Sequence, residues 1–139
     1  MKILVVNGPN MNLLGIREPK IYGPRSYEEL CSYIKKLEPE CELFQSNHEG
    51  DIIDKIQSAI GSFEGIVINP AGYTHTSVAI ADALSAVGIP AVEVHLSDIN
   101  SREDFRKLSF VRPVCEKTFM GRGFESYADA INYLKEAHS

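Results

Sequence analysis

The 139-residue sequence has few cysteines and no long hydrophobic run. Its three cysteines, Cys31, Cys41 and Cys115, are an odd number without CxxC spacing, so neither a disulfide framework nor a zinc site is expected. No apolar stretch approaches the roughly 18 residues that a membrane span requires. Met1-Lys2 leads directly into an apolar segment without a cleavage signature, which favours a cytoplasmic protein.

Motifs that define several common enzyme classes are also absent. The segment Asn7–Asn10 is neither a GxGxxG fingerprint nor a P-loop, and no serine occupies a nucleophile elbow. His48 and His138 are not spaced with carboxylates as metal ligands. The net charge of −5 argues against a general nucleic-acid binder, although arginines inside a cleft can still attract an anionic substrate.

The order of apolar segments predicts an α/β fold. A hydrophobic content of 44% and the chain length fit a single domain, residues 1–139. Strands alternate with helices, which indicates a parallel sheet covered on both faces: a flavodoxin-like three-layer sandwich with five strands in the order 2-1-3-4-5. The expected strands are Lys2–Val6, Cys41–Gln45, Gly65–Ile68, Ala91–Val94 and Glu116–Met120. Helices are expected from Ser26 behind a capping box with Glu29, over Asp51–Ser62, Thr76–Val87 and Arg102–Lys107, and from Phe124 onward.

Three of these strands run into segments rich in uncharged polar side chains: Leu4–Asn12, Ile66–Ser77 and Ala91–Asn100. The carboxyl ends of parallel strands meet at one rim of the sheet, where ligands bind. Amides and imidazoles at that rim suit a small hydroxylated molecule better than a metal or a nucleic acid. None of the three segments contains lysine, which weakens a Schiff-base mechanism.

Glu93 and His95 are candidates for acid–base chemistry. They lie two residues apart in a predicted strand, so both side chains share one face. A buried carboxylate is costly unless it is paired, and pairing with His95 would orient the imidazole for proton transfer. A structural ion pair explains this pattern equally well.

The connection Gly8–Arg25 has about 18 residues and no apolar periodicity, as is typical of functional loops. It contains Tyr22, with Arg17 and Arg25 close in sequence. Nearby positive charge favours a phenolate, so Tyr22 is a candidate base. Taken alone, a packing role for this tyrosine is the commoner explanation.

Further candidates come from the same rim. His75 lies at the entrance of the helix expected over Thr76–Val87, although part of that segment only caps the helix. Free backbone N–H groups of Leu96 and Ser97 could bind a carboxylate. Arg106 is either a clamp for an anion or hydroxyl, or a surface charge.

The helix over Thr76–Val87 is apolar on nearly all sides, and Asp82 is its only charged residue. Such a helix is usually buried on both sides, so we expect it to pack against another subunit. A helix covered by a loop is the alternative.

Five motifs together resemble the type II 3-dehydroquinate dehydratases. They occur in the family's order and span most of residues 1–110: NGPNMNLLG (Asn7–Gly15), REPKIYG (Arg17–Gly23), SNHEGDIID (Ser46–Asp54), INPAGYTHTSVAIADAL (Ile68–Leu84) and EVHLSDINSREDFRKLS (Glu93–Ser109). The stretch Val111–Arg122 is the least similar to the family. A flavodoxin-like carboxylate-binding module without catalysis is the alternative.

The resemblance implies the removal of water from 3-dehydroquinate to give 3-dehydroshikimate, by anti elimination through an enolate, in aromatic amino-acid biosynthesis or in quinate breakdown. It implies that Tyr22 is the base and that Arg17 favours its phenolate. A water near Asn10 would stabilise the enolate oxygen. His95, oriented by Glu93, would protonate the leaving hydroxyl.

The resemblance also implies the substrate contacts and the assembly. The contacts are Asn69, His75 and Arg106 for ring hydroxyls, the N–H groups of Leu96 and Ser97 for the carboxylate, and Asp82 from a neighbouring subunit. The family assembles as a dodecamer, a tetramer of trimers, and uses no metal or organic cofactor. The Gly8–Arg25 loop would act as a lid.

Overall fold

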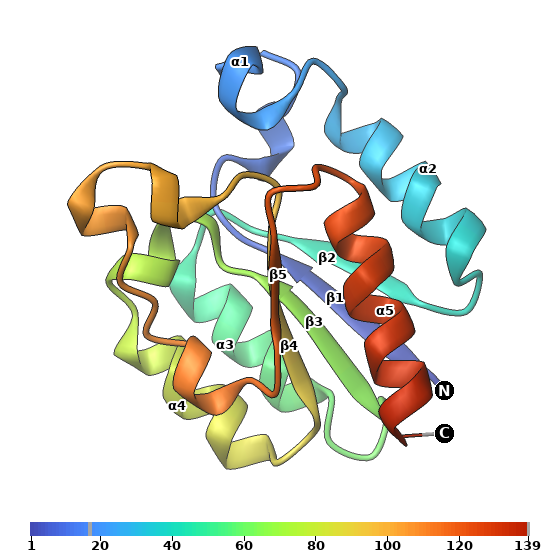
Figure 1. Cartoon of the computed structure of the whole chain (residues 1–139). Coiled ribbons are helices and arrows are strands. Elements are labelled where there is room, and N and C mark those ends of the chain that lie inside the picture. The colour runs from blue at the N-terminus through green and yellow to red at the C-terminus, as the bar shows by residue number, and fades with distance from the viewer. Residues whose placement is uncertain (17, 139) are drawn as a thin grey trace.

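A computed structural model describes residues 1–16 and 18–138, which form a parallel five-stranded sheet between two layers of helices (Figure 1). The sheet order is β2-β1-β3-β4-β5, which confirms the predicted topology. The strands are β1 (Ile3–Asn7), β2 (Glu42–Gln45), β3 (Gly65–Asn69), β4 (Ala91–His95) and β5 (Thr118–Met120).

Helices α2 (Tyr27–Leu37) and α5 (Glu125–His138) cover one face of the sheet, and α3 (Glu49–Ser58) and α4 (Val78–Val87) cover the other (Figure 1). The short helix α1 (Pro19–Tyr22) lies beyond the carboxyl ends of the strands (Figure 1). No helix in the part of the chain that the structure describes is long and apolar enough to cross a membrane.

Local sequence signals set two of the helix starts. The hydroxyl of Ser26 accepts the backbone N–H of Glu29 at 3.2 Å, and the Glu29 carboxylate accepts the backbone N–H of Ser26, so the predicted capping box begins α2. Ser77 caps α4 by accepting the N–H of Ile80 at 2.9 Å. These caps fix where each helix leaves the rim of the sheet.

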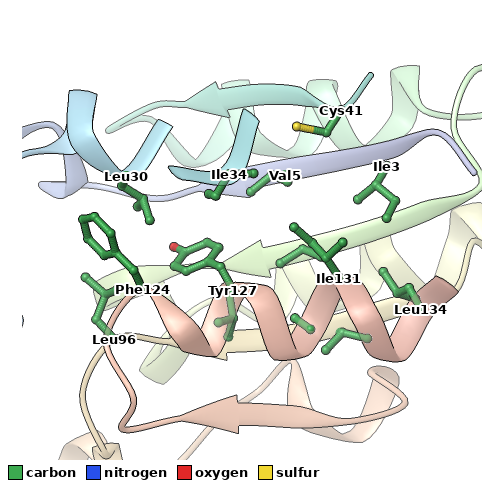
Figure 2. Packing of buried hydrophobic residues seen from close by; sticks show 14 of the residues in the cluster. Ile3, Val5, Leu30, Ile34, Cys41, Leu96, Phe124, Tyr127, Ile131 and Leu134 are labelled. Carbon is green, nitrogen blue, oxygen red and sulfur yellow. The ribbon is translucent and has the colours of Figure 1, made fainter. Parts of the chain in front are cut away.

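Two apolar clusters hold the layers together. Strands β1, β3 and β4 are buried along their whole length and supply side chains to both clusters. Figure 2 shows the cluster under α2 and α5, where Leu30 and Ile34 of α2 lie opposite Tyr127 and Ile131 of α5 on the same face of the sheet. Fully burying one such aliphatic side chain contributes roughly 1.5–3 kcal/mol. The sheet therefore offers a rigid support for the loops at its carboxyl edge.

Two predicted helices were placed wrongly. The helix expected over Asp51–Ser62 begins at Glu49 and ends at Ser58, because the chain turns at Gly61, whose φ is +76°. The segment Arg102–Lys107 is not a helix of its own: it holds a 3₁₀ turn over Asp104–Arg106, after another over Ile99–Ser101.

Candidate active site

A small cavity of about 40 Å³ lies at the carboxyl edge of the sheet, at the ends of β3 and β4. The cavity brings together side chains from segments that are far apart in the sequence. Seven of the predicted site residues line it: Tyr22, Asn69, His75, His95, Leu96, Ser97 and Arg106.

The carboxylate of Glu93 is fully buried and receives four donors. His95 Nε2 lies 2.6 Å from Oε2, and the hydroxyl of Ser109 donates to the same oxygen at 2.7 Å. Arg112 Nε and the hydroxyl of Thr118 donate to Oε1 at 3.1 and 2.8 Å. Burial alone would raise the pKa of Glu93, but the hydrogen bonds and the nearby imidazole outweigh burial and lower that pKa to about 2.

The Glu93 pairing also fixes the His95 ring. Because a carboxylate only accepts, Nε2 is the nitrogen that carries the proton in this bond. Nδ1 is then the ring nitrogen left for other partners, in a side chain that is 5% exposed and lines the cavity. The arrangement suits the transfer of a proton between His95 and a bound molecule.

Acid should destabilise the protein partly through Glu93. The folded-state pKa of about 2 lies below the ordinary value of 4.5, so Glu93 stabilises the fold above pH 4.5 and loses that contribution as the pH falls toward 2. The full contribution to the free energy of unfolding is on the order of 3 kcal/mol.

Urea unfolding should therefore show that the difference in unfolding free energy between the wild type and Glu93→Gln shrinks between pH 5 and pH 3. Glu136→Gln, at an exposed position of α5, is the matched control; a difference for Glu93→Gln that stays constant with pH would contradict this account.

Tyr22 reaches the cavity from α1 and contacts Arg102, which is not among the predicted site residues. Arg102 donates to the Tyr22 hydroxyl at 2.8 Å, and its guanidinium lies 5.1 Å from the centre of the ring. An outer hollow of about 760 Å³ shares Tyr22, Arg102, Leu96 and Ser97 with the inner cavity. The Tyr22–Arg102 pair thus forms part of the wall between the two spaces.

His75 is held as a hydrogen-bond acceptor for the cavity. Its Nδ1 lies 2.7 Å from the carbonyl oxygen of Leu108, so this nitrogen donates. Burial lowers the pKa of His75, and the charges of Arg106 and Arg102 lower it further, against the opposing effect of the Leu108 bond. In the neutral ring, Nε2 is free to accept from a hydroxyl.

Arg106 stands at the same side of the cavity. Its Nε forms an ion pair with Glu103 at 2.7 Å, and its side chain is 22% exposed. A planar guanidinium in this position can donate to an anion or to hydroxyls.

In the described part of the chain, three predicted site residues do not line the cavity: Asn10, Asp82 and Glu93, the last of which holds His95. Arg17 lies outside the described residues. Asn10 is exposed, adopts a φ of +67°, and donates its backbone N–H to the side chain of Asn47 at 2.9 Å. Asp82 lies on the exposed face of α4, beside other small or apolar residues: Val78, Ala79, Ser85 and Ala86. Residues 1–16 and 18–138 contain no group of three or more His, Cys, Asp or Glu side chains that could hold a metal ion.

The fold and the cavity together define a class of protein. A carboxylate-supported histidine and a tyrosine face one polar cavity at the carboxyl edge of a flavodoxin-like sheet. Such a set belongs to enzymes that move protons on a small polar substrate.

The chain belongs to the type II dehydroquinase family, because the family model described as dehydroquinase class II matches residues 1–135. A 3-dehydroquinate dehydratase of Clostridium acetobutylicum is 51% identical over 97% of this chain and 96% of that protein. A 3-dehydroquinate dehydratase of Acaryochloris marina is 55% identical over 95% of this chain and 91% of that protein. The crystal structure of a type II dehydroquinase from Butyrivibrio crossotus superimposes with a TM-score of 0.95 at 52% identity, covering 97% of each chain.

Proposed function

We propose that this chain is a 3-dehydroquinate dehydratase, a hydro-lyase of the shikimate pathway, and that Tyr22 and His95 carry out its two proton transfers. Family membership supports the activity. The observation that carries the mechanism is the Glu93–His95 pair at a cavity that Tyr22 also lines.

The reaction divides into two steps. Tyr22, as phenolate, removes the C2 proton beside the ketone, and the electron pair moves into the carbonyl to form an enolate. A water near Asn10 stabilises the enolate oxygen, and Arg17 favours the phenolate. The enolate then expels the C1 hydroxyl, which leaves as water after His95 donates a proton to it. Base and acid lie on opposite sides of the substrate ring, which makes the elimination anti.

Five of the cavity residues are proposed to bind the substrate. Asn69, Arg106 and the free Nε2 of His75 would hold the ring hydroxyls. The backbone N–H groups of Leu96 and Ser97, directly after β4, would bind the carboxylate. Binding by fixed backbone donors costs little reorganisation, so the substrate is held with its C1 hydroxyl toward His95.

Substrate entry requires the wall at Tyr22 to move. A cavity of about 40 Å³ has space for little more than a water, whereas small-molecule sites usually enclose at least about 300 Å³. We propose that Gly8–Arg25, which contains α1, acts as a lid. Its opening would separate Tyr22 from Arg102 and join the inner cavity to the outer hollow of about 760 Å³.

Asp82 is proposed to reach the site of a neighbouring subunit in a trimer, four of which would form a dodecamer. The mostly apolar exposed face of α4 around Asp82 supports a subunit contact there. Asp82→Ala should raise KM or reduce assembly, measured by steady-state kinetics and sedimentation velocity, without lowering the thermal midpoint by more than a few degrees. Unchanged kinetics together with unchanged sedimentation would exclude the cross-subunit role.

The direct test of the activity is near-ultraviolet absorbance after 3-dehydroquinate is added to protein that has been treated with chelator. Dehydration creates a conjugated enone, so product formation raises the absorbance. A second sample receives borohydride together with substrate, which traps any lysine imine. A rise in both samples is expected. A rise lost only with borohydride would indicate a Schiff-base route, and no rise in either would favour a carboxylate-binding module.

A further inference from the structure

A series of hydrogen-bonded, mostly buried polar side chains begins at Asn69 in the cavity wall and leads away from the cavity. Asn69 Nδ2 donates to the hydroxyl of Tyr127 at 3.0 Å, and that hydroxyl donates to Oδ1 of Asn7 at 2.6 Å. Asn7 Nδ2 in turn lies 3.4 Å from the hydroxyl of Tyr27. Asn7 and Tyr127 are fully buried, and Asn69 is 4% exposed. Tyr127 belongs to α5, where it packs in the same core cluster as the apolar side chains of Ile131 and Leu134 (Figure 2).

We propose that Tyr127 is a positioning residue for substrate binding, which holds the Asn69 amide in the orientation that the substrate needs. The inference rests on the proposed role of Asn69 in binding a ring hydroxyl. No residue of α5, Tyr127 included, lines the described cavity, so Tyr127 acts through Asn69.

The direction of each hydrogen bond fixes the amide. A tyrosine hydroxyl has one proton, and Tyr127 uses it on Asn7 Oδ1, so toward Asn69 the hydroxyl can only accept. Burial raises the pKa of Tyr127 above its usual range, which keeps that proton in place. At the other end of the amide, Asn69 Oδ1 accepts the backbone N–H of Ala71 at 3.1 Å. A flipped amide would lose both bonds in a buried site.

This orientation leaves one donor for the substrate. Asn69 Nδ2 also lies 3.6 Å from the sulfur of Met11, which lines the cavity. A thioether is a weak acceptor, so a substrate hydroxyl can take its place as the partner of the second N–H. Tyr127 therefore selects the N–H end of Asn69 for the substrate and excludes the carbonyl end.

Tyr127→Phe keeps the ring and removes the hydroxyl. We expect KM to rise about tenfold with kcat changed less than about twofold, because a loosened ground-state contact weakens substrate binding without altering the proton transfers. Tyr27→Phe is the matched control: it also removes a hydroxyl bonded to Asn7, but at Nδ2 and away from Asn69. Its KM should stay within about twofold of wild type.

A double-mutant cycle separates positioning from general stability. Asn69→Ala should raise KM, and adding Tyr127→Phe to Asn69→Ala should cause no further rise, because Tyr127 then has no amide to hold. Additive effects, or an equal rise in Tyr27→Phe, would overturn the role of Tyr127 and leave the proposed function standing. If Asn69→Ala kept the wild-type KM, Asn69 would not bind the substrate and Tyr127 would not position it. Turnover in that variant would still support dehydratase activity.

A measurement on the wild type covers the case in which Tyr127→Phe does not fold. Tyrosine labelled with carbon-13 at Cζ reports the state of each hydroxyl by NMR. Titration with 3-dehydroshikimate should shift the Tyr127 signal, because the product reorganises the amide that donates to it. It should leave the signal of Tyr133, whose ring packs against Phe119 of β5 and whose hydroxyl donates to Glu116, unshifted. A Tyr127 signal that does not move, or moves no more than that of Tyr133, would overturn the proposal.

Discussion

Replacing Tyr22 with phenylalanine should lower kcat by about a thousandfold while substrate binding changes little. The substitution keeps the ring that lines the cavity and removes only the hydroxyl, which is the atom proposed to take the C2 proton. The contact with Arg102 at 2.8 Å is lost as well, so the lid should open more readily rather than less. Enone absorbance measures kcat. Isothermal titration calorimetry with substrate measures binding, because the variant turns the substrate over only very slowly.

The matched control is Tyr133→Phe, which removes a hydroxyl that donates to Glu116 and does not line the cavity. It should keep wild-type turnover. Turnover in Tyr22→Phe within tenfold of the wild type would remove Tyr22 as the base. A loss of binding equal to the loss of kcat would instead identify it as a substrate contact.

Local periodicity was enough to predict the sheet and the hydrogen-bonded pair of Glu93 and His95. Strands β1, β3 and β4 are short runs rich in valine and isoleucine, and their alternation with helices predicted a parallel sheet whose right-handed crossovers gave the strand order. Glu93 and His95 were paired correctly because residues two apart in a strand share a face whatever the rest of the fold does.

The helix α3 shows where periodicity fails. Ile52 and Ile53 are adjacent, and each begins an apolar stripe that includes Ile56. The helix predicted over Asp51–Ser62 includes Ile60, but Ile60 lies beyond the end of α3 and is 64% exposed, whereas Ile52 is buried. Only packing against the sheet decides between two stripes of equal apolar character.

Side-chain contacts between segments that are far apart in the chain could not be predicted from the sequence. Arg102 and Tyr22 are 80 residues apart, and Thr118 reaches Glu93 from the neighbouring strand. Tyr127 has helical spacing with the apolar residues of α5, so its hydroxyl gave no separate signal. In each case the function of the side chain depends on which element the fold brings against it.

Replacing His95 with asparagine should also lower kcat by about a hundredfold to ten-thousandfold, but at a later step than Tyr22→Phe. If His95 acts only when the C1 hydroxyl leaves, the variant should still form the enolate. In D₂O, His95→Asn should therefore exchange the C2 hydrogen of 3-dehydroquinate for deuterium without making product, whereas Tyr22→Phe should do neither.

Mass spectrometry of recovered substrate, set against enone absorbance, measures the two steps separately. Glu93→Gln keeps the His95 ring but replaces the carboxylate that holds Nε2–H at 2.6 Å, so its kcat should fall between those of His95→Asn and the wild type. Deuterium at C2 is measured at low conversion, because saturating product would suppress exchange in His95→Asn and in the wild type alike. Loss of C2 exchange in His95→Asn under those conditions would assign His95 to proton removal, and full turnover would exclude it from the chemistry.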